Sequence, residues 1–223
     1  SAQSAGSNYS RQVNTLIGTK GVGLTSGYLY PGATYPYGMV QFTPSYFSKR
    51  SGFVINQLSG GGCEHMGNFP TFPVKGKLKM SPDNILNYRI NISEEKGHAG
   101  YYEAKVQEDI HAKLTVTERT GMASYEYPAD QQYGTVIIGG GISATPIEQA
   151  AIVITAPNKC EGYAEGGNFC GLRTPYKVYF VAEFDTDAFE TGTWKREELM
   201  PNTTFAEGEY SGVYFTFDVN KKK

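Results

Sequence analysis

Apolar and polar side chains alternate along many short stretches of this chain. In His111–Arg119, Leu114 and Val116 face one way, whereas Lys113 and Thr115 face the other. Such a period of two is typical of a strand with one buried face. Similar β-prone segments are Met39–Thr43, Tyr88–Ile92, Tyr101–Val106, Met122–Tyr127, Thr135–Ile138, Ile152–Thr155, Tyr176–Phe184 and Val213–Val219. The pattern predicts a strand at each of them.

The strand-like segments are separated by turn signals rather than by helical periods. The 27 glycines and 11 prolines are dispersed through the whole sequence. Only Pro146–Ala151 and Arg196–Met200 suggest helix, each as one short turn. This arrangement predicts an all-β antiparallel sandwich rather than βαβ units. We expect one domain over residues 12–220, after a loose polar leader, Ser1–Arg11.

Composition narrows the class of protein further. The chain has 223 residues, of which 17 are Tyr, 12 Phe and one Trp, and 19% are charged. So many aromatic residues argue against intrinsic disorder. Lys and Arg number 20 against 22 Asp and Glu, a net charge of −2, so no basic excess favours a nucleic-acid partner. No apolar run approaches the ~20 residues that a membrane span requires.

The three cysteines, Cys63, Cys160 and Cys170, do not form a disulfide framework. Cys160 and Cys170 lie ten positions apart and could pair, or all three could be buried or reduced thiols. Cys63 and His65 do not indicate a zinc site without two further ligands nearby.

No catalytic motif emerges from the residues alone. Gly139–Ala144 matches the dinucleotide fingerprint, but Pro146 and a strand-like segment follow where that motif needs a helix. We therefore interpret it as a bend between strands. The sequence holds no phosphate loop and no G-x-S-x-G elbow. Neither His98, a turn or pocket residue, nor His111, a surface strand residue, indicates a catalytic site. Glu94 and Glu95 would point to opposite faces of a strand.

Two glycine-rich regions differ from ordinary strand-and-turn sequence. The first is Ile17–Gly23 followed by Tyr30–Gln41, and the second is Leu58–Pro70. Glycine allows a backbone to turn sharply or to approach a ligand, and binding sites are often carried on loops of a rigid sheet. We expect a ligand site here, although both regions could also be plain crossovers between sheets.

These two regions resemble the opening of glycoside hydrolase family 92. The resemblance rests on Val13–Thr19, Pro31–Gln41, Leu58–Cys63 and Met66–Pro70, and it continues in order to Val219. Later matching blocks are Ala99–Tyr102, Leu114–Gly121, Phe169–Gly171, Tyr179–Asp185 and Gly192–Trp194. Members are typically calcium-dependent, inverting exo-α-mannosidases.

The resemblance implies an N-terminal β-sandwich of the galactose-mutarotase-like supersandwich class, followed in the parent protein by a helical (α/α)₆ domain. That domain would carry the acid, the base and the calcium ligands, so no catalytic or metal residue is expected in this chain. The expected partners are the helical domain and an α-mannose-containing glycan. The family also implies a secreted, periplasmic or cell-surface bacterial protein.

The remaining role of the sandwich would be one wall of the sugar pocket. The candidate wall residues are Tyr28, Gly60, Cys63, Glu64, His65 and Asn68. Glu64 and Asn68 could bind sugar hydroxyls, and His65 or Tyr28 could offer a ring face. The chain departs from the family at Ile55–Gln57, where many members carry His-Thr-His. The alternative function is a free-standing carbohydrate-binding module, and a third possibility is a purely structural role.

Overall fold

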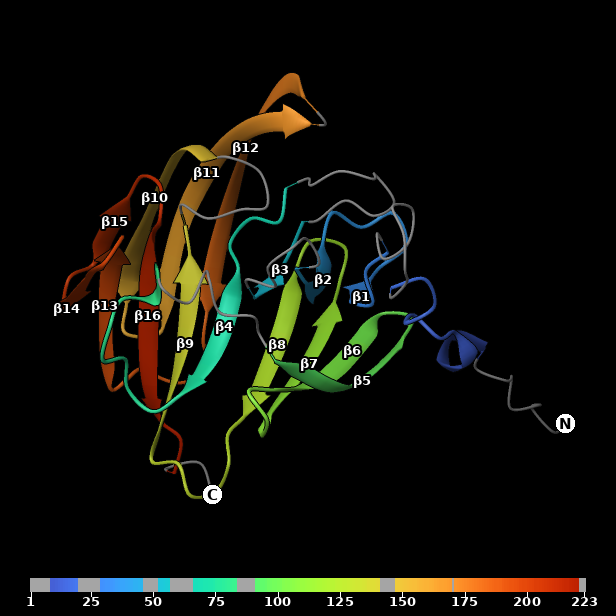
Figure 1. Cartoon of the computed structure of the whole chain (residues 1–223), viewed down its shortest axis with the longest axis horizontal. Helices are drawn as coiled ribbons and strands as arrows, with labels where there is room; N and C mark the ends of the chain where they lie inside the picture. Colours follow the sequence, from blue (N-terminus) through green and yellow to red (C-terminus); the bar gives the residue numbers. More distant parts are fainter. Residues whose placement is uncertain are drawn as a thin grey trace, which may run out of the picture.

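The computed structural model describes residues 9–19, 29–45, 52–56, 66–83, 91–140, 147–169 and 171–220. Nearly all of its regular structure is strand, and every pairing between named strands is antiparallel (Figure 1). The 3₁₀ turn η1 covers Tyr9–Gln12. Within these ranges, no helix has the length and apolar character needed to cross a bilayer.

An eight-stranded sheet forms the middle of the molecule, with the order β1-β2-β3-β4-β9-β16-β13-β14. Its strands are β1 (Ala33–Thr34), β2 (Gln41–Pro44), β3 (Phe53–Val54), β4 (Thr71–Lys75), β9 (Tyr133–Gly139), β13 (Glu190–Lys195), β14 (Glu198–Pro201) and β16 (Ser211–Asp218). β9 lies between β4 and β16, so strands that are far apart in the sequence are neighbours in this sheet.

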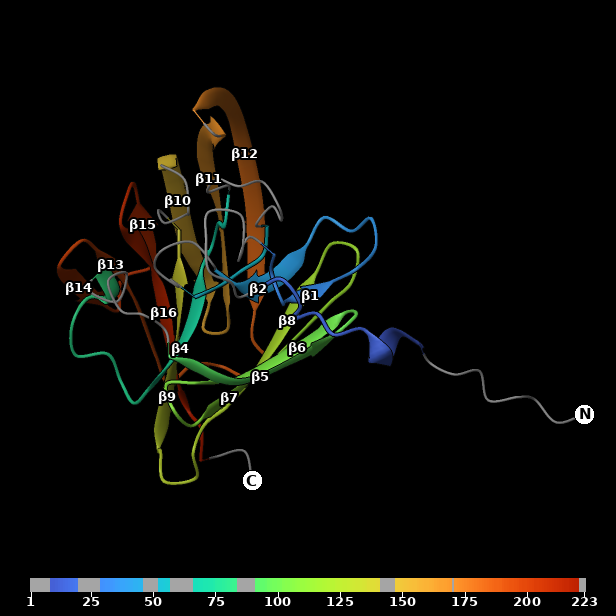
Figure 2. The ribbon, with the colours of Figure 1, turned by 45° about the vertical axis from the view of Figure 1, so that its right-hand side comes forward.

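Two four-stranded sheets complete the fold. One follows the chain as a meander of β5 (Ile92–His98), β6 (Tyr101–Val106), β7 (Ile110–Val116) and β8 (Gly121–Glu126). The other has the order β12-β11-β10-β15 and contains β10 (Ile147–Ala156), β11 (Lys159–Phe169), β12 (Leu172–Glu183) and β15 (Phe205–Glu207). Figure 2 shows one end of the long β11–β12 hairpin rising above the rest of the molecule, at the top of the view.

The middle sheet is buried on both faces. Ile137 of β9 and Tyr214 of β16 belong to a core cluster shared with the β5–β8 sheet. Their chain neighbours, such as Val136 and Phe215, belong to a second cluster shared with β10 and β11. Successive side chains of a strand point to opposite faces, so these two clusters lie on opposite sides of the middle sheet. Consequently β9 and β16 are buried almost continuously rather than alternately.

The predicted all-β antiparallel sandwich is therefore confirmed. Tyr101–Val106 forms β6 with the predicted bounds, and the remaining predicted strands overlap observed ones. β7 ends three residues before the predicted Arg119 because Thr117 N–H donates to the Thr120 carbonyl and closes a turn. Of the predicted Tyr88–Ile92 strand, residues 88–90 lie outside the described residues, and Ile92 opens β5. The domain boundary at residue 12 stays a prediction.

Both predicted helical turns are wrong. Ile147–Ala151 belongs to β10 and Glu198–Met200 to β14. In each case pairing with a neighbouring strand outweighs the local preference: β10 pairs with β11, and β14 pairs with β13. β9 ends at Gly139 and β10 begins at Ile147, whereas residues 141–146, over which most of the bend was predicted, lie outside the described residues.

Candidate functional site

The structure joins the end of the first glycine-rich region to residues that directly precede the second. Gln41 closes the first region, and its N–H donates to the Ile55 carbonyl at 3.0 Å. Gln41 also forms an isolated bridge with Asn56, just before the second region begins. The end of the first region thus lies beside the residues that lead into the second.

Three polar side chains connect both flanks of the second region to β12. Asn56 Nδ2 donates to Asn68 Oδ1 at 2.9 Å, and the Asn68 backbone N–H donates to Asn56 Oδ1 at 2.7 Å. Tyr176 of β12 donates its hydroxyl to the same Asn68 Oδ1 at 3.2 Å. Asn68 is fully buried, and its Nδ2 has no hydrogen-bond partner among the described residues. We name Asn56, Asn68 and Tyr176 the asparagine clamp.

The loop between β1 and β2, which leads into Gln41, exposes large apolar side chains. Tyr37 is completely exposed, and Met39 is 72% exposed. Tyr37 also has a φ of 60°, a backbone conformation that is uncommon for a bulky residue. The loop is held by Gly38 N–H donating to the Tyr35 carbonyl and by Met39 N–H donating to the Glu118 carbonyl, at 2.9 and 2.7 Å. An exposed aromatic ring on a fixed backbone is suited to contact a ligand or another domain.

Of the predicted wall residues, the structure describes only Asn68. Tyr28, Gly60, Cys63, Glu64 and His65 lie outside the described residues. Asn68 holds the loop flank through the clamp, and its contact with sugar stays a prediction.

Sequence reasoning missed Asn56, Tyr176 and Tyr37 as site residues. Asn56 stands at a recognised departure from the family pattern, which was the available signal. Tyr176 comes from a strand 108 positions away from Asn68, so nothing local could have indicated it. The positive φ of Tyr37 depends on how its loop is anchored.

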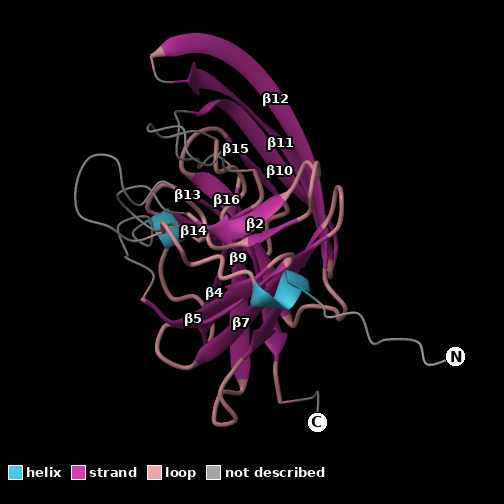
Figure 3. Ribbon diagram, turned by 90° about the vertical axis from the view of Figure 1, so that its right-hand side faces the viewer, coloured by secondary structure: helices cyan, strands magenta, loops and turns pink. Residues whose placement is uncertain are grey.

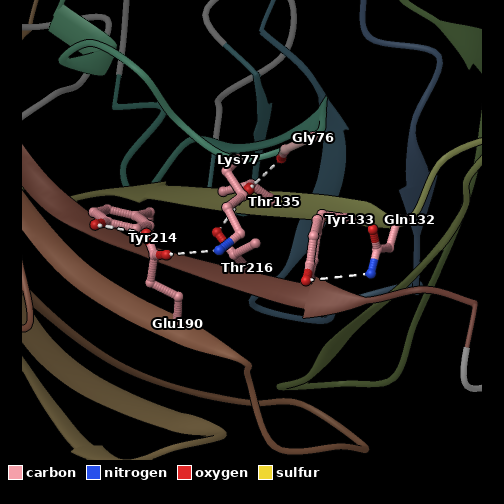
Figure 4. A network of polar contacts seen from close by, with 8 residues as sticks. All are labelled: Gly76, Lys77, Gln132, Tyr133, Thr135, Glu190, Tyr214 and Thr216. Atoms are coloured by element: carbon pink, nitrogen blue, oxygen red, sulfur yellow. Dashed lines mark hydrogen bonds and ion pairs between the residues drawn. The ribbon is translucent and has the colours of Figure 1, made fainter.

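A second polar network lies on the middle sheet (Figure 4). Glu190 accepts hydrogen bonds from Lys77 Nζ at 3.3 Å and from the Tyr214 hydroxyl at 3.5 Å. The ammonium of Lys77 lies over the Tyr133 ring, 4.7 Å from its centroid. Burial, followed by the nearby Glu190 carboxylate, raises the pKa of Tyr214 to about 12. Each charge has a partner, so this network joins β9, β13 and β16 rather than offering a reactive group.

Acidic side chains in the described ranges are dispersed over the surface. Glu94 accepts from Lys105 at 2.7 Å, whereas Glu95 accepts from the Tyr102 hydroxyl at 3.0 Å. The two neighbours therefore bind different partners, and a bulge separates them from regular pairing. No group of three or more His, Cys, Asp and Glu side chains converges within the described residues. These residues do not fit a calcium site, which needs six to eight oxygen ligands.

The histidines described have ordinary surroundings. His98 ends β5 with its ring stacked on Tyr101, the two centroids 5.0 Å apart. His111 is exposed on β7, as predicted. Neither contacts the asparagine clamp in the structure as described.

Cys160 is a free, fully buried thiol in the core. Burial raises its pKa to about 12, against a smaller opposing effect of a hydrogen bond from the Ala182 backbone. Cys160 lies at the start of β11, and Phe169 ends that strand. Cys63 and Cys170, the other two cysteines, lie outside the described residues, so the possible pairing of Cys160 with Cys170 stays a prediction.

Comparison with known proteins identifies the class as that of glycoside hydrolases. The family model described as the glycosyl hydrolase family 92 N-terminal domain matches residues 12–223. The chain therefore belongs to family 92 and constitutes its N-terminal domain, as the resemblance implied. An uncharacterized secreted glycosidase of Arthroderma benhamiae is 32% identical over 138 residues, which cover 53% of this chain and 17% of the fungal protein.

Solved structures show the same fold. A family 92 α-mannosidase from Bacteroides thetaiotaomicron is 24% identical, with a TM-score of 0.77, and the match covers 94% of this chain and 31% of that one. An inverting mannosidase of the same family and organism is also 24% identical, with a TM-score of 0.76 over 95% of this chain and 29% of that one. The chain thus spans less than a third of the length of these relatives.

Proposed function

We propose that this chain is the N-terminal sandwich of a secreted exo-α-mannosidase and that it completes the sugar-binding cleft of a C-terminal helical catalytic domain. The reaction of the parent enzyme is hydrolysis of terminal α-mannosides with inversion. The family match over residues 12–223 carries this proposal. The similarity in fold to an α-mannosidase and to an inverting mannosidase supports the substrate and the stereochemistry.

The contribution of the sandwich is to position loops. Inverting glycosidases need two carboxyl groups ~6.5–9.5 Å apart with a water between them. We infer that both carboxyl groups belong to the helical domain. The asparagine clamp fixes both flanks of the second glycine-rich region, and the Tyr37 loop, which leads into the Gln41 that bridges Asn56, presents an exposed ring. These two features support a cleft wall at this part of the sandwich.

We also propose that the calcium expected in the parent enzyme is bound by the helical domain, because the described residues of the sandwich do not fit such a site. When bound, calcium would orient sugar hydroxyls and stabilise negative charge. The relative from Arthroderma benhamiae, which is described as secreted, supports export of the parent protein.

An assay with an aryl α-mannoside tests the proposal. The chain and a longer polypeptide that continues past Lys223 into the helical domain are compared, each with calcium and after chelation. We expect turnover only by the longer polypeptide, with the β-anomer of mannose as the first product in a proton NMR time course. Turnover by the chain alone would refute the proposal that the catalytic carboxyl groups belong to the helical domain, and release of the α-anomer would refute inversion.

A further inference from the structure

The outer face of the β12-β11-β10-β15 sheet bears an apolar groove. Register places Tyr163 beside Tyr179 and Ala151, and it places Val153 between Glu161 and Phe205. Small side chains on β10 form the floor, while the tyrosines and Phe205 stand at either side. The groove has a volume of about 380 Å³. We name the surface formed by Ala151, Val153, Glu161, Tyr163, Tyr179, Val181 and Phe205 the β12 groove.

The aromatic and aliphatic side chains of the groove are unusually exposed. Tyr179 is 70% exposed, Val181 61% and Phe205 53%. The outer face of the β5–β8 sheet is different, because lysine–glutamate pairs cover it, such as Lys105–Glu94 and Lys113–Glu126. An apolar centre with aromatic anchors is typical of a surface that another protein surface covers.

Charged groups frame the β12 groove. The Lys177–Glu165 pair, at 2.5 Å, bounds one end, and the Lys159–Glu183 pair, at 3.8 Å, bounds the other. Glu161 lies between Val153 and Val181 at the centre and is exposed. It has no ion-pair partner among the described residues. Complementary charge therefore requires a lysine or arginine on the partner, surrounded by apolar side chains.

The end of the domain lies close to one rim of this groove. Phe184, the residue after β12, packs against Phe217 of β16 with ring centroids 5.0 Å apart. Val219 joins the same core cluster, and its N–H donates to the Gln132 carbonyl at 3.0 Å. Val181 is three residues before Phe184, which corresponds to about 10 Å of strand. A polypeptide that continues past Val219 thus leaves the core beside the Lys159–Glu183 end of the groove.

We propose that the β12 groove is the surface on which the C-terminal part of a family 92 chain docks, with a basic side chain facing Glu161. The proposal rests on the proposed function for its partner. The solved relatives have a C-terminal part long enough to cover the groove, because the match to this domain covers only 31% of one α-mannosidase chain. Figure 3 shows β11 and β12 arching over the top of the molecule, so the strands that carry the groove are curved rather than flat.

Hydroxyl-radical footprinting with mass spectrometry tests the docking surface. The chain alone is compared with the longer polypeptide that continues past Lys223. We expect modification of Tyr179 and Phe205 to fall by about fivefold or more in the longer polypeptide, because anchor side chains are desolvated at an interface. Met122, which is 66% exposed on the opposite outer sheet, serves as the internal control and keeps its reactivity. Equal modification of Tyr179 in both polypeptides would overturn the proposal.

Substitutions supply a second measurement. In the longer polypeptide, Val181→Glu and Glu161→Lys are expected to split a single thermal transition into two, as the domains separate. Met122→Glu is the matched control and leaves one transition. In the chain alone all three variants keep the parental melting temperature, because each side chain is exposed. A single transition in all three longer variants would count against docking here.

Other occupants of the groove give different results in the chain alone. A dimer in sedimentation velocity that Val181→Glu abolishes would assign the groove to a second copy and overturn the proposal. Protection of Tyr179 by an α-mannose oligosaccharide would assign it to sugar, with the same consequence. Mannosidase activity of the longer polypeptide separates the two hypotheses. A protected but inactive enzyme contradicts only the proposed function, and an active but unprotected one contradicts only the docking surface.

Discussion

Removal of the Asn68 side chain tests the asparagine clamp most directly. In Asn68→Ala, Asn56 Nδ2 and the Tyr176 hydroxyl both lose their acceptor, Oδ1, at 2.9 and 3.2 Å. The bond from the Asn68 backbone N–H to Asn56 remains possible. The substitution therefore removes two hydrogen bonds at a fully buried position.

The expected cost follows from these two bonds. A neutral hydrogen bond contributes roughly 0.5–1.5 kcal/mol net, so the free energy of unfolding should fall by about 1–3 kcal/mol. For a domain of this size, a loss of about 2 kcal/mol corresponds to a decrease in Tm of roughly 4–8 °C. Urea unfolding followed by tryptophan fluorescence measures the free energy, and calorimetry measures Tm. Asn91→Ala, at an exposed position, is the control and should change stability by less than about 0.5 kcal/mol.

A double-mutant cycle makes the prediction more specific. Asn56 and Asn68 share two hydrogen bonds, so the double alanine variant should lose about 1 kcal/mol less than the sum of the single variants. Additive losses, or an Asn68→Ala protein as stable as the parent, would refute the clamp as described.

Three further predictions concern the core. Gly212→Ala should prevent folding or cost more than about 3 kcal/mol, because a Cβ would lie 2.3 Å from Trp194 Cη2 and 2.4 Å from a backbone carbonyl; urea unfolding measures this. Cys160 should resist iodoacetamide at pH 8, since its pKa near 12 keeps the thiol protonated; peptide mapping of the labelled native protein shows this. Tyr214 and Tyr101 have folded pKa values raised to about 12 and should therefore stabilise the fold below pH 10. This contribution should be lost between about pH 10 and 12, because the two tyrosines ionise at lower pH in the unfolded chain than in the folded protein. Unfolding curves across this range measure the loss.

Each of these predictions has a control variant or a result that would contradict it. Gly76→Ala meets nothing within 4 Å, so only its φ of +73° opposes the substitution, and its cost should be much smaller than that of Gly212→Ala. Rapid labelling of Cys160 in native protein would contradict its burial. For the tyrosines, stability that stays constant from pH 9 to 12 would show that the folded and unfolded pKa values are equal.

Sequence patterns predicted strands best where one face meets water. β6 alternates between half-buried and buried residues, and its predicted bounds agree with those observed. β11 was missed because Gly162, Gly166 and Gly167 lower its strand propensity. At Gly162 a Cβ would lie 2.3 Å from the Ala151 carbonyl oxygen, so tertiary packing demands the residue that local preference disfavours.

The candidate site was less accessible from sequence. Its location at the glycine-rich regions came from composition and from the family resemblance. The clamp partner Tyr176 arises from the pairing of distant strands, which no local pattern encodes. The groove on β12 was missed for a similar reason: Tyr179 and Val181 alternate with the inward-facing Val178 and Phe180, and the sequence does not reveal which face remains uncovered.

The position of β16 has a consequence for synthesis on the ribosome. This strand lies between β9 and β13 and covers Ser211–Asp218, the last strand among the described residues. When the nascent polypeptide has emerged only as far as β15, the edge of β9 that pairs with β16 has no partner strand. Both apolar faces of β9 are then incompletely covered as well. The β5–β8 sheet and the β10–β11–β12 strands can form from local contacts, whereas the middle layer must wait for β16. Chaperone engagement should therefore persist until translation has passed the end of β16.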